Sequence, residues 1–181
     1  MAEAFSNKLT RAAGIVTTSS SGSIGITTTI ITGISTVGVA VSDLVDNSNF
    51  IAGTKVTGFG AAASQVVVDQ TSTNTSSASA QIVNFLGMTT AFTSAAATKS
   101  ILIGGTFANN TASSVNLTVE VHDASAGVQA AIASKIPVPT GSSFVISDAG
   151  KTVLEGDDEL RVYCDVENAI DVNLSILKGV S

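Results

Sequence analysis

The stretch LRVYCDVENAIDVNLSIL, residues 160–177, contains two segments in which apolar and polar residues alternate, separated by the polar triplet ENA. Side chains at every second position of a β-strand lie on the same face of the sheet. The apolar positions of the two segments are Leu160, Val162, Cys164 and Val166, followed by Ile170, Val172, Leu174 and Ile176. The stretch therefore predicts two amphipathic antiparallel strands that bury one face each and are joined by a short turn.

The same pattern extends over the C-terminal half of the chain. Strand-like segments follow one another at intervals of about ten residues, with turn residues such as Asn, Asp, Gly or Pro between them. The segments before residue 160 are 100–108, 115–121, 128–135, 144–147 and 152–155. This spacing predicts an antiparallel, jelly-roll-like β-sandwich domain over residues 100–181. Within it, AGVQAAIASK (126–135) is rich in alanine, so a helical turn competes there with the favoured strand.

The composition of the whole chain also favours β-structure. Val and Ile together number 36 against 9 Leu, and Thr contributes 22 further β-branched residues. Such side chains suit a pleated surface and are disfavoured in helices. Leu, Ile, Val and Phe account for 52 of the 181 residues, which is enough apolar surface to argue against a disordered chain. The expected fold class is all-β.

The N-terminal half is less regular than the C-terminal half. Residues 1–14 are a short leader of mixed charge that ends in LTRAAG, and they are expected to form a short N-terminal arm, with a brief helix as the alternative. Residues 15–69 are a β-rich region that frequent glycines divide into short strands. Residues 70–99 are expected to be a polar connection with one strand at 81–86. The low-complexity run DQTSTNTSSASA (69–80) is interpreted as a linker or exposed loop, with a polar edge strand as the alternative.

Charge and cysteine content argue against several classes of function. Eight Lys and Arg against fourteen Asp and Glu give a net charge of −6 with no basic run, so nucleic acid is not expected as a partner. No membrane partner is expected either, because the chain is acidic and no apolar run approaches the roughly 18 residues of a membrane span. The start MAEAFSNKLTR lacks the apolar core of a secretory signal. A single cysteine rules out an internal disulfide and a cysteine-based zinc site.

Few residues could carry catalysis. His122 is the sole histidine and is expected on the polar face at a strand end, as a solvated turn residue rather than a catalytic or metal-binding one. Cys164 falls on the apolar face of its segment and is expected in the core. The acidic stretch LEGDDEL (154–160) lacks the spacing of a calcium loop and favours a tight Gly-Asp turn. We therefore predict no catalytic, cofactor-binding or metal-binding residue, no cofactor and no enzymatic activity.

Several segments share a pattern with a known group of proteins. IPVPTGSSFVI (136–146), KTVLEGDDELRV (151–162) and NAIDVNLSIL (168–177) follow one another in the C-terminal half. Together they resemble a small β-module of virion structural proteins from tailed bacteriophages, including marine and cyanobacterial phages. The leader SNKLTRAAGIVTT (6–18) and the segment GISTVGVAVSDLVDNSNFIAGTKVTGFG (33–60) are similar to other parts of such proteins. The resemblance covers roughly two thirds of the chain and contains no catalytic motif.

The resemblance implies a non-enzymatic virion structural protein. Its location would be the virion, as an accessory component of the particle surface: a capsid decoration or cement protein, or a neck- or tail-associated one. It would act through protein–protein contacts in a symmetric homo-oligomer, with a trimer favoured by analogy, and its partners would be itself and capsid, neck or tail subunits. The candidate interface residues lie in the N-terminal arm and are Phe5, Lys8, Leu9 and Arg11.

Two alternatives remain open. The first is a receptor- or glycan-binding module of a phage tail or fibre. In it, exposed residues contact a host glycan, such as Asn109, Asn110, His122 and Tyr163. No Trp and one Tyr leave little aromatic surface for stacking on a sugar. The second is a polysaccharide hydrolase, for which Asp157 and Glu159 would alternate onto one strand face, although a turn explains this acidic pair better.

Overall fold

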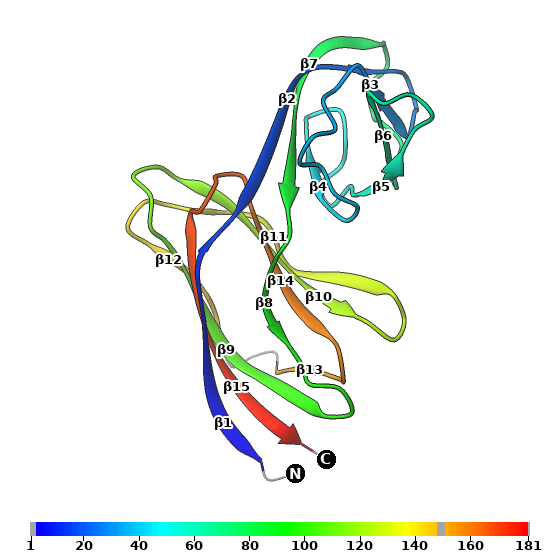
Figure 1. The fold of residues 1–181 in the computed structure, drawn as a ribbon. Coiled ribbons are helices and arrows are strands. Elements are labelled where there is room, and N and C mark those ends of the chain that lie inside the picture. Colours follow the sequence, from blue (N-terminus) through cyan, green and yellow to red (C-terminus); the bar gives the residue numbers. More distant parts are fainter. Residues whose placement is uncertain (1–2, 148–150, 181) are drawn as a thin grey trace. The chain divides into compact units, whose positions relative to one another are not determined.

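The computed structural model describes residues 3–147 and 151–180. Every regular element in these residues is a β-strand, and the paired strands run antiparallel, which confirms the expected all-β fold class. The strands form two compact units, whose elements are labelled in Figure 1. Residues 1–14 with 89–181 are called the terminal unit, and residues 15–88 the inserted unit. Among the described residues, no helix is long and apolar enough to cross a membrane.

The terminal unit contains two antiparallel sheets with one core between them. The first, called the β15 sheet, has the strand order β1–β15–β9–β12, and β13 also pairs with β9. Its strands are β1 (Ala4–Ala13), β9 (Lys99–Asn109), β12 (Ser143–Ile146), β13 (Thr152–Leu154) and β15 (Ile170–Val180). The second, called the β14 sheet, has the order β11–β10–β14–β8. Its strands are β8 (Thr89–Thr93), β10 (Val115–Asp123), β11 (Val128–Val138) and β14 (Glu159–Cys164). The alanine-rich segment thus contributes to a strand, as favoured.

The core of the terminal unit is built by alternation along the strands of both sheets. Leu174 and Ile176 of β15 and Leu160 and Val162 of β14 are all fully buried in it. Burying a large aliphatic side chain stabilises a fold by about 1.5–3 kcal/mol, which offsets part of the entropy lost by the chain. The apolar positions predicted inward within residues 160–177 all lie in this core or pack against it, so that prediction is confirmed.

The segment predicted to be an N-terminal arm is an edge strand of the β15 sheet. β1 pairs with β15 from Ala4 opposite Lys178 to Ala13 opposite Ile170. An edge strand has one neighbour in its sheet, and within β1 only Ala13 is buried. Because the other side chains of β1 are not buried, the run SNKLTR lacks the alternation of apolar and polar residues by which a strand is recognised in a sequence.

The segment predicted to be a polar connection, residues 70–99, also differs from the structure. It contains two strands, β7 (Ala78–Gly87) and β8, where one was expected. The border between the two units falls between these strands, after residue 88. The sandwich therefore draws on β1 and β8 in addition to the predicted range 100–181.

The inserted unit contains one six-stranded sheet with the order β4–β7–β2–β3–β6–β5. Besides β7, its strands are β2 (Ile15–Ile24), β3 (Ile30–Thr32), β4 (Leu44–Asp46), β5 (Val56–Phe59) and β6 (Gln65–Val68). Four of the six have only three or four residues, in keeping with the dense glycines. Its core includes Ile31, Val66 and Phe85, all fully buried.

The low-complexity run after β6 is a mostly exposed loop of the inserted unit that leads into β7, so the exposed loop is confirmed and the linker is not. Ser72 is 5% exposed. Its hydroxyl donates to the carbonyl oxygen of Gly25 at 2.8 Å and accepts the backbone N–H of Thr28 at 3.0 Å. The backbone N–H of Thr73 donates to the carbonyl oxygen of Asn49 at 2.8 Å. Hydrogen bonds of Ser72 and Thr73, rather than burial of apolar side chains, hold this segment in place. Such bonds cannot be predicted from composition.

Candidate functional site

His122 lies within β10 rather than in a turn. It is opposite Glu159 of β14 and Gln129 of β11, and β10 continues to Asp123. Its side chain is half-buried, and within the described residues its buried Nδ1 atom has no hydrogen-bond partner. The expected position at a strand end is confirmed, whereas the half-buried side chain differs from the expected solvated turn residue. Neither cross-strand neighbour is a hydroxyl or thiol nucleophile, and the Glu159 carboxylate already accepts the Arg161 Nε–H at 2.7 Å.

Cys164 is fully buried in the core of the terminal unit, as predicted. Burial raises the pKa of its thiol to about 11. Because the thiolate is the nucleophilic form, the side chain is unreactive at neutral pH. Cys164 serves as a small apolar core residue.

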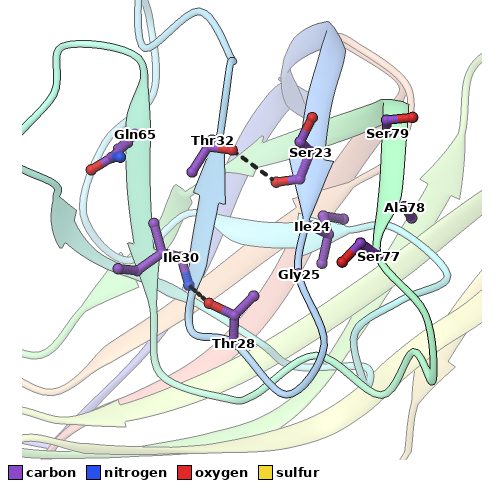
Figure 2. Close-up of a pocket in the computed structure, with 10 residues that line it drawn as sticks. All are labelled: Ser23, Ile24, Gly25, Thr28, Ile30, Thr32, Gln65, Ser77, Ala78 and Ser79. Carbon is purple, nitrogen blue, oxygen red and sulfur yellow. Dashed lines mark hydrogen bonds between the residues drawn. The ribbon is translucent and has the colours of Figure 1, made fainter.

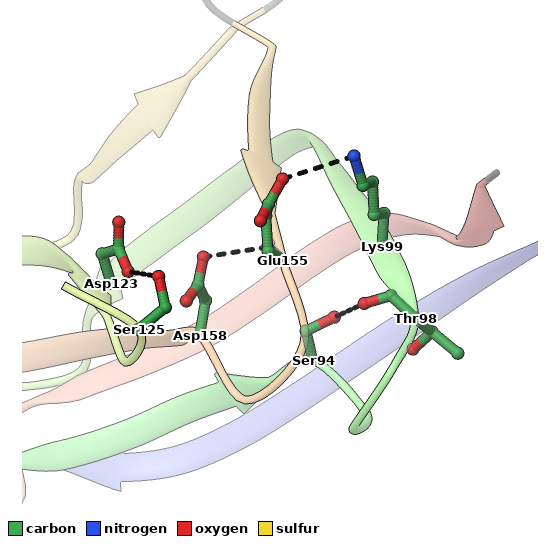
Figure 3. Close-up of polar contacts among 7 residues, drawn as sticks. All are labelled: Ser94, Thr98, Lys99, Asp123, Ser125, Glu155 and Asp158. Carbon is green, nitrogen blue, oxygen red and sulfur yellow. Dashed lines mark hydrogen bonds and ion pairs between the residues drawn. The ribbon is translucent and has the colours of Figure 1, made fainter.

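The acidic stretch LEGDDEL forms the predicted turn, between β13 and β14. Figure 3 shows two contacts of this stretch, the hydrogen bond between Glu155 and Asp158 and the ion pair between Glu155 and Lys99. Asp158, 5% exposed, accepts the backbone N–H of Glu155 at 2.8 Å and that of Ala124 at 3.0 Å. The second bond joins this turn to the one between β10 and β11. Glu155 forms an ion pair with Lys99 of β9 at 3.3 Å.

The remaining acids of this region offer no catalytic pair. Asp123 accepts the backbone N–H of Ala126 at 2.9 Å and the hydroxyl of Ser125 at 2.8 Å, and these bonds hold its pKa below the usual value. Asp157 lies in the turn with a left-handed φ of 69°, so it does not share a strand face with Glu159 as the hydrolase alternative requires. Across residues 3–147 and 151–180, no three His, Cys, Asp or Glu are grouped to hold a metal ion.

A cavity of about 610 Å³ opens on the inserted unit beside β2 and β3 (Figure 2). Its lining is uncharged and includes Ser23, Ile24, Thr28, Ile30, Thr32 and Gln65. Two of its hydroxyls bond to the backbone: Thr28 Oγ1 accepts the N–H of Ile30 at 3.1 Å, and Thr32 Oγ1 donates to the carbonyl of Ser23 at 3.3 Å. With no titratable lining residue, the cavity suits a neutral polar group and not acid–base chemistry.

Three of the four predicted interface residues share one side of β1. Phe5 and Leu9 are 80% and 68% exposed, and alternation along the strand places Arg11 on the same side. This side is the solvent-facing face of the β15 sheet, because Phe5 lies opposite Leu177 of β15 and Leu9 opposite Asn173.

Lys8 points to the other side of β1. It lies opposite Leu174, whose side chain is buried in the core, so the two share the inward face. There Lys8 borders a groove with Phe92 and Lys178 at the β1–β8 edge of the sandwich. The Nζ atom of Lys178 lies 5.7 Å from the centre of the Phe92 ring. The structure therefore separates Lys8 from the other three predicted residues.

The exposed apolar face extends well beyond β1. Phe5 is opposite Leu177, Leu177 is opposite Ile101, and Ile101 is opposite Val153. Directly opposed residues share a face, so this apolar row crosses four strands without a break. We call this surface the outer face of the β15 sheet. Its apolar members are Phe5, Leu9, Ile101, Val145, Val153 and Leu177.

Sequence reasoning missed most of this face, although one signal was present. The run ILI at 101–103 is apolar at consecutive positions, so it places apolar side chains on both faces of β9. Such continuous runs are typical of strands that are buried on both faces. Leu102 is buried inward, whereas Ile101 is half-buried on the outer face, opposite Leu177 and Val153.

The residues suggested for glycan contact are not gathered into a site. Asn109 is 6% exposed, and its side-chain amide donates to the carbonyls of Ser113 at 2.7 Å and Val138 at 2.9 Å. Tyr163 lies inside β14 and is buried, whereas Asn110 is exposed in the turn after β9. Of these three residues Asn110 alone is exposed, and its side-chain amide donates to Asp171 Oδ1 at 3.4 Å.

Comparison with known proteins found no match among family models, curated proteins or solved structures. The candidate site is therefore defined by its own residues. Among the surfaces described, the outer face of the β15 sheet combines three predicted interface residues with an apolar row that spans four strands.

Proposed function

We propose that this chain is a non-enzymatic structural component of a tailed bacteriophage particle. It acts as an accessory protein of the particle surface, either a capsid decoration or cement protein or a neck- or tail-associated one. It works through protein–protein contacts within a symmetric homo-oligomer, and the resemblance given above favours a trimer. The same resemblance supports the virion as its location.

The outer face of the β15 sheet is the observation that carries this proposal. Four of its side chains are more than half exposed, namely Phe5 at 80%, Leu9 at 68%, Val145 at 54% and Val153 at 51%. Contiguous exposed apolar surface is typical of protein contact sites. By contrast, Cys164 is buried and Asp158 is bonded into a turn. These features favour a role in contact over a role in catalysis.

The proposal is tested by following the chain through purification of phage particles. Particles of a phage that encodes this chain are banded on a density gradient, and each fraction is quantified by mass spectrometry. We expect the chain to follow the major capsid protein at a constant ratio, also after a high-salt wash, because salt screens charges but does not weaken apolar contacts. A chain that stays with a non-structural phage protein at the top of the gradient would contradict the proposal.

The cavity of the inserted unit favours one alternative, a receptor- or glycan-binding module. Its hydroxyl and amide lining matches the neutral hydroxyls of a sugar. The measurement is binding of the intact chain to a glycan array, with Thr32→Val as the variant and Thr57→Val, on β5, as the control. Binding that only Thr32→Val removes would support this alternative.

A further inference from the structure

We infer that the outer face of the β15 sheet binds a neighbouring copy of the same chain. The inference deepens the proposed function and rests on its claim that the protein acts by protein contacts. It assigns the contact to a flat sheet surface, of which β1 is one edge, in place of the predicted N-terminal arm. The occupant is argued below from the register, the charge and the area of this face.

The register places the apolar side chains in line, so that they form one surface. The first row is Phe5, Leu177, Ile101 and Val153, on β1, β15, β9 and β13. A second row runs through opposed residues of β1, β15, β9 and β12, in the order Leu9, Asn173, Thr106 and Val145. Between the rows lie Asn7, Ser175 and Gly104, again directly opposed. Small central residues leave the face flat enough for another sheet to pack about 10 Å away.

The charge distribution explains why a second copy fits this face. The whole chain carries a net charge of −6, so most pairs of surfaces on two copies would bring acids together. On the outer face, the strand positions between the two ends are uncharged. One end carries Arg11 and Asp171, which border the same depression, and the other carries the Lys99–Glu155 ion pair at 3.3 Å. Each end of the face therefore has one base and one acid. When two copies meet through this face, the base of one copy can lie next to the acid of the other at either end.

The size of the face is also sufficient. Four strands spaced by about 4.8 Å and about 30 Å of strand length between the two charged ends give a footprint of about 600 Å² per copy, within which the two apolar rows lie about 14 Å apart. Two such faces bury about 1,200 Å², which reaches the lower end of the range for stable protein interfaces. Association through this face also covers the outward side of β9, whose run ILI is apolar toward both sides.

The test uses the full chain and a pair of matched variants. Val153→Asp places a charge in the first apolar row, and Val128→Asp is the control, because these valines are 51% and 56% exposed and both lie on strands of the terminal unit. Light scattering coupled to size-exclusion chromatography gives the mass over a range of concentrations, and circular dichroism reports whether each variant is folded. Leu9→Asp, in the second row on the edge strand, repeats the test if Val153→Asp does not fold.

We expect the wild type and Val128→Asp to show two or three times the chain mass of 18.1 kDa at about 10 μM. Val153→Asp and Leu9→Asp are expected to raise the concentration needed for association at least about tenfold. A monomeric wild type, or an oligomer that both face variants leave intact, would overturn the inference. If the wild type is monomeric but still bands with phage particles, the inference and the homo-oligomer fail, whereas the role as a component of the particle stands. If it associates but is absent from particles, the proposed function fails instead.

Discussion

Removal of the Asp158 carboxylate should weaken the terminal unit measurably. Asp158→Ala deletes two hydrogen bonds from backbone N–H groups, those of Glu155 at 2.8 Å and Ala124 at 3.0 Å. Bonds to a charged acceptor contribute about 1.5–3 kcal/mol each, and water can reach part of a turn, so we expect a loss of about 2–4 kcal/mol. The loss is expected to be shared by two turns, because the carboxylate joins the β13–β14 turn to the β10–β11 turn.

Urea unfolding measures this loss, and fluorescence of Tyr163, the single tyrosine, reports on the terminal unit. With a slope of about 2 kcal/mol per molar urea, the midpoint should fall by about 1–2 M. Asp157→Asn is the matched control, because Asp157 is exposed and asparagine tolerates its left-handed φ of 69°. It should stay within about 0.5 kcal/mol of the wild type. If Asp158→Ala also stayed within that range, the carboxylate would not hold the two turns together.

Three further predictions concern other positions. A Cβ at Gly14, where φ is 123°, would overlap the carbonyl oxygen of Val166, so Gly14→Ala should cost about 3 kcal/mol or more in urea unfolding. Gly53→Ala, with φ 91° and nothing within 4 Å, should cost only about 1 kcal/mol, and equal losses would refute the overlap. Cys164, with its pKa raised by burial to about 11, should resist a thiol-labelling reagent at pH 8 until urea unfolds the chain, and rapid labelling of the native chain would argue against its burial. Burial raises the pKa of Asp43 above 3.8, so the folded state binds its proton more tightly than the unfolded state, and stability is lost as pH rises through the raised pKa. The free energy of unfolding of Asp43→Asn, minus that of the wild type, should therefore be larger at pH 7 than at pH 3. A difference that does not change with pH would count against this.

How much of the fold could be predicted depended on whether a strand buries one whole face. Residues 160–166 and 170–176 belong to strands with a neighbour on each side, and they bury one whole face, so apolar and polar residues alternate clearly along them. The prediction of which of their side chains point inward is correct. β1 lies at an edge and buries one residue, Ala13, so its sequence resembles an arm. Ser72 is fixed by hydrogen bonds to Gly25 and Thr28, which composition does not encode.

The candidate site was predictable only in part, for a different reason. Phe5 and Leu9 stand out in the sequence because they are apolar residues in a polar leader. Their continuation through Leu177, Ile101 and Val153 depends on which strands pair and in which register. Those pairings join residues more than 50 positions apart, and alternation within single strands does not predict which strands pair.

The most direct test of the account is a cryo-electron microscopy map of an intact particle of a phage that encodes this chain. The account predicts density for the terminal unit at symmetry-related positions on the particle surface, with the outer face of the β15 sheet covered by protein. A particle map in which every surface protein is assigned and this chain is absent would contradict the claim that it is a structural component of the virion.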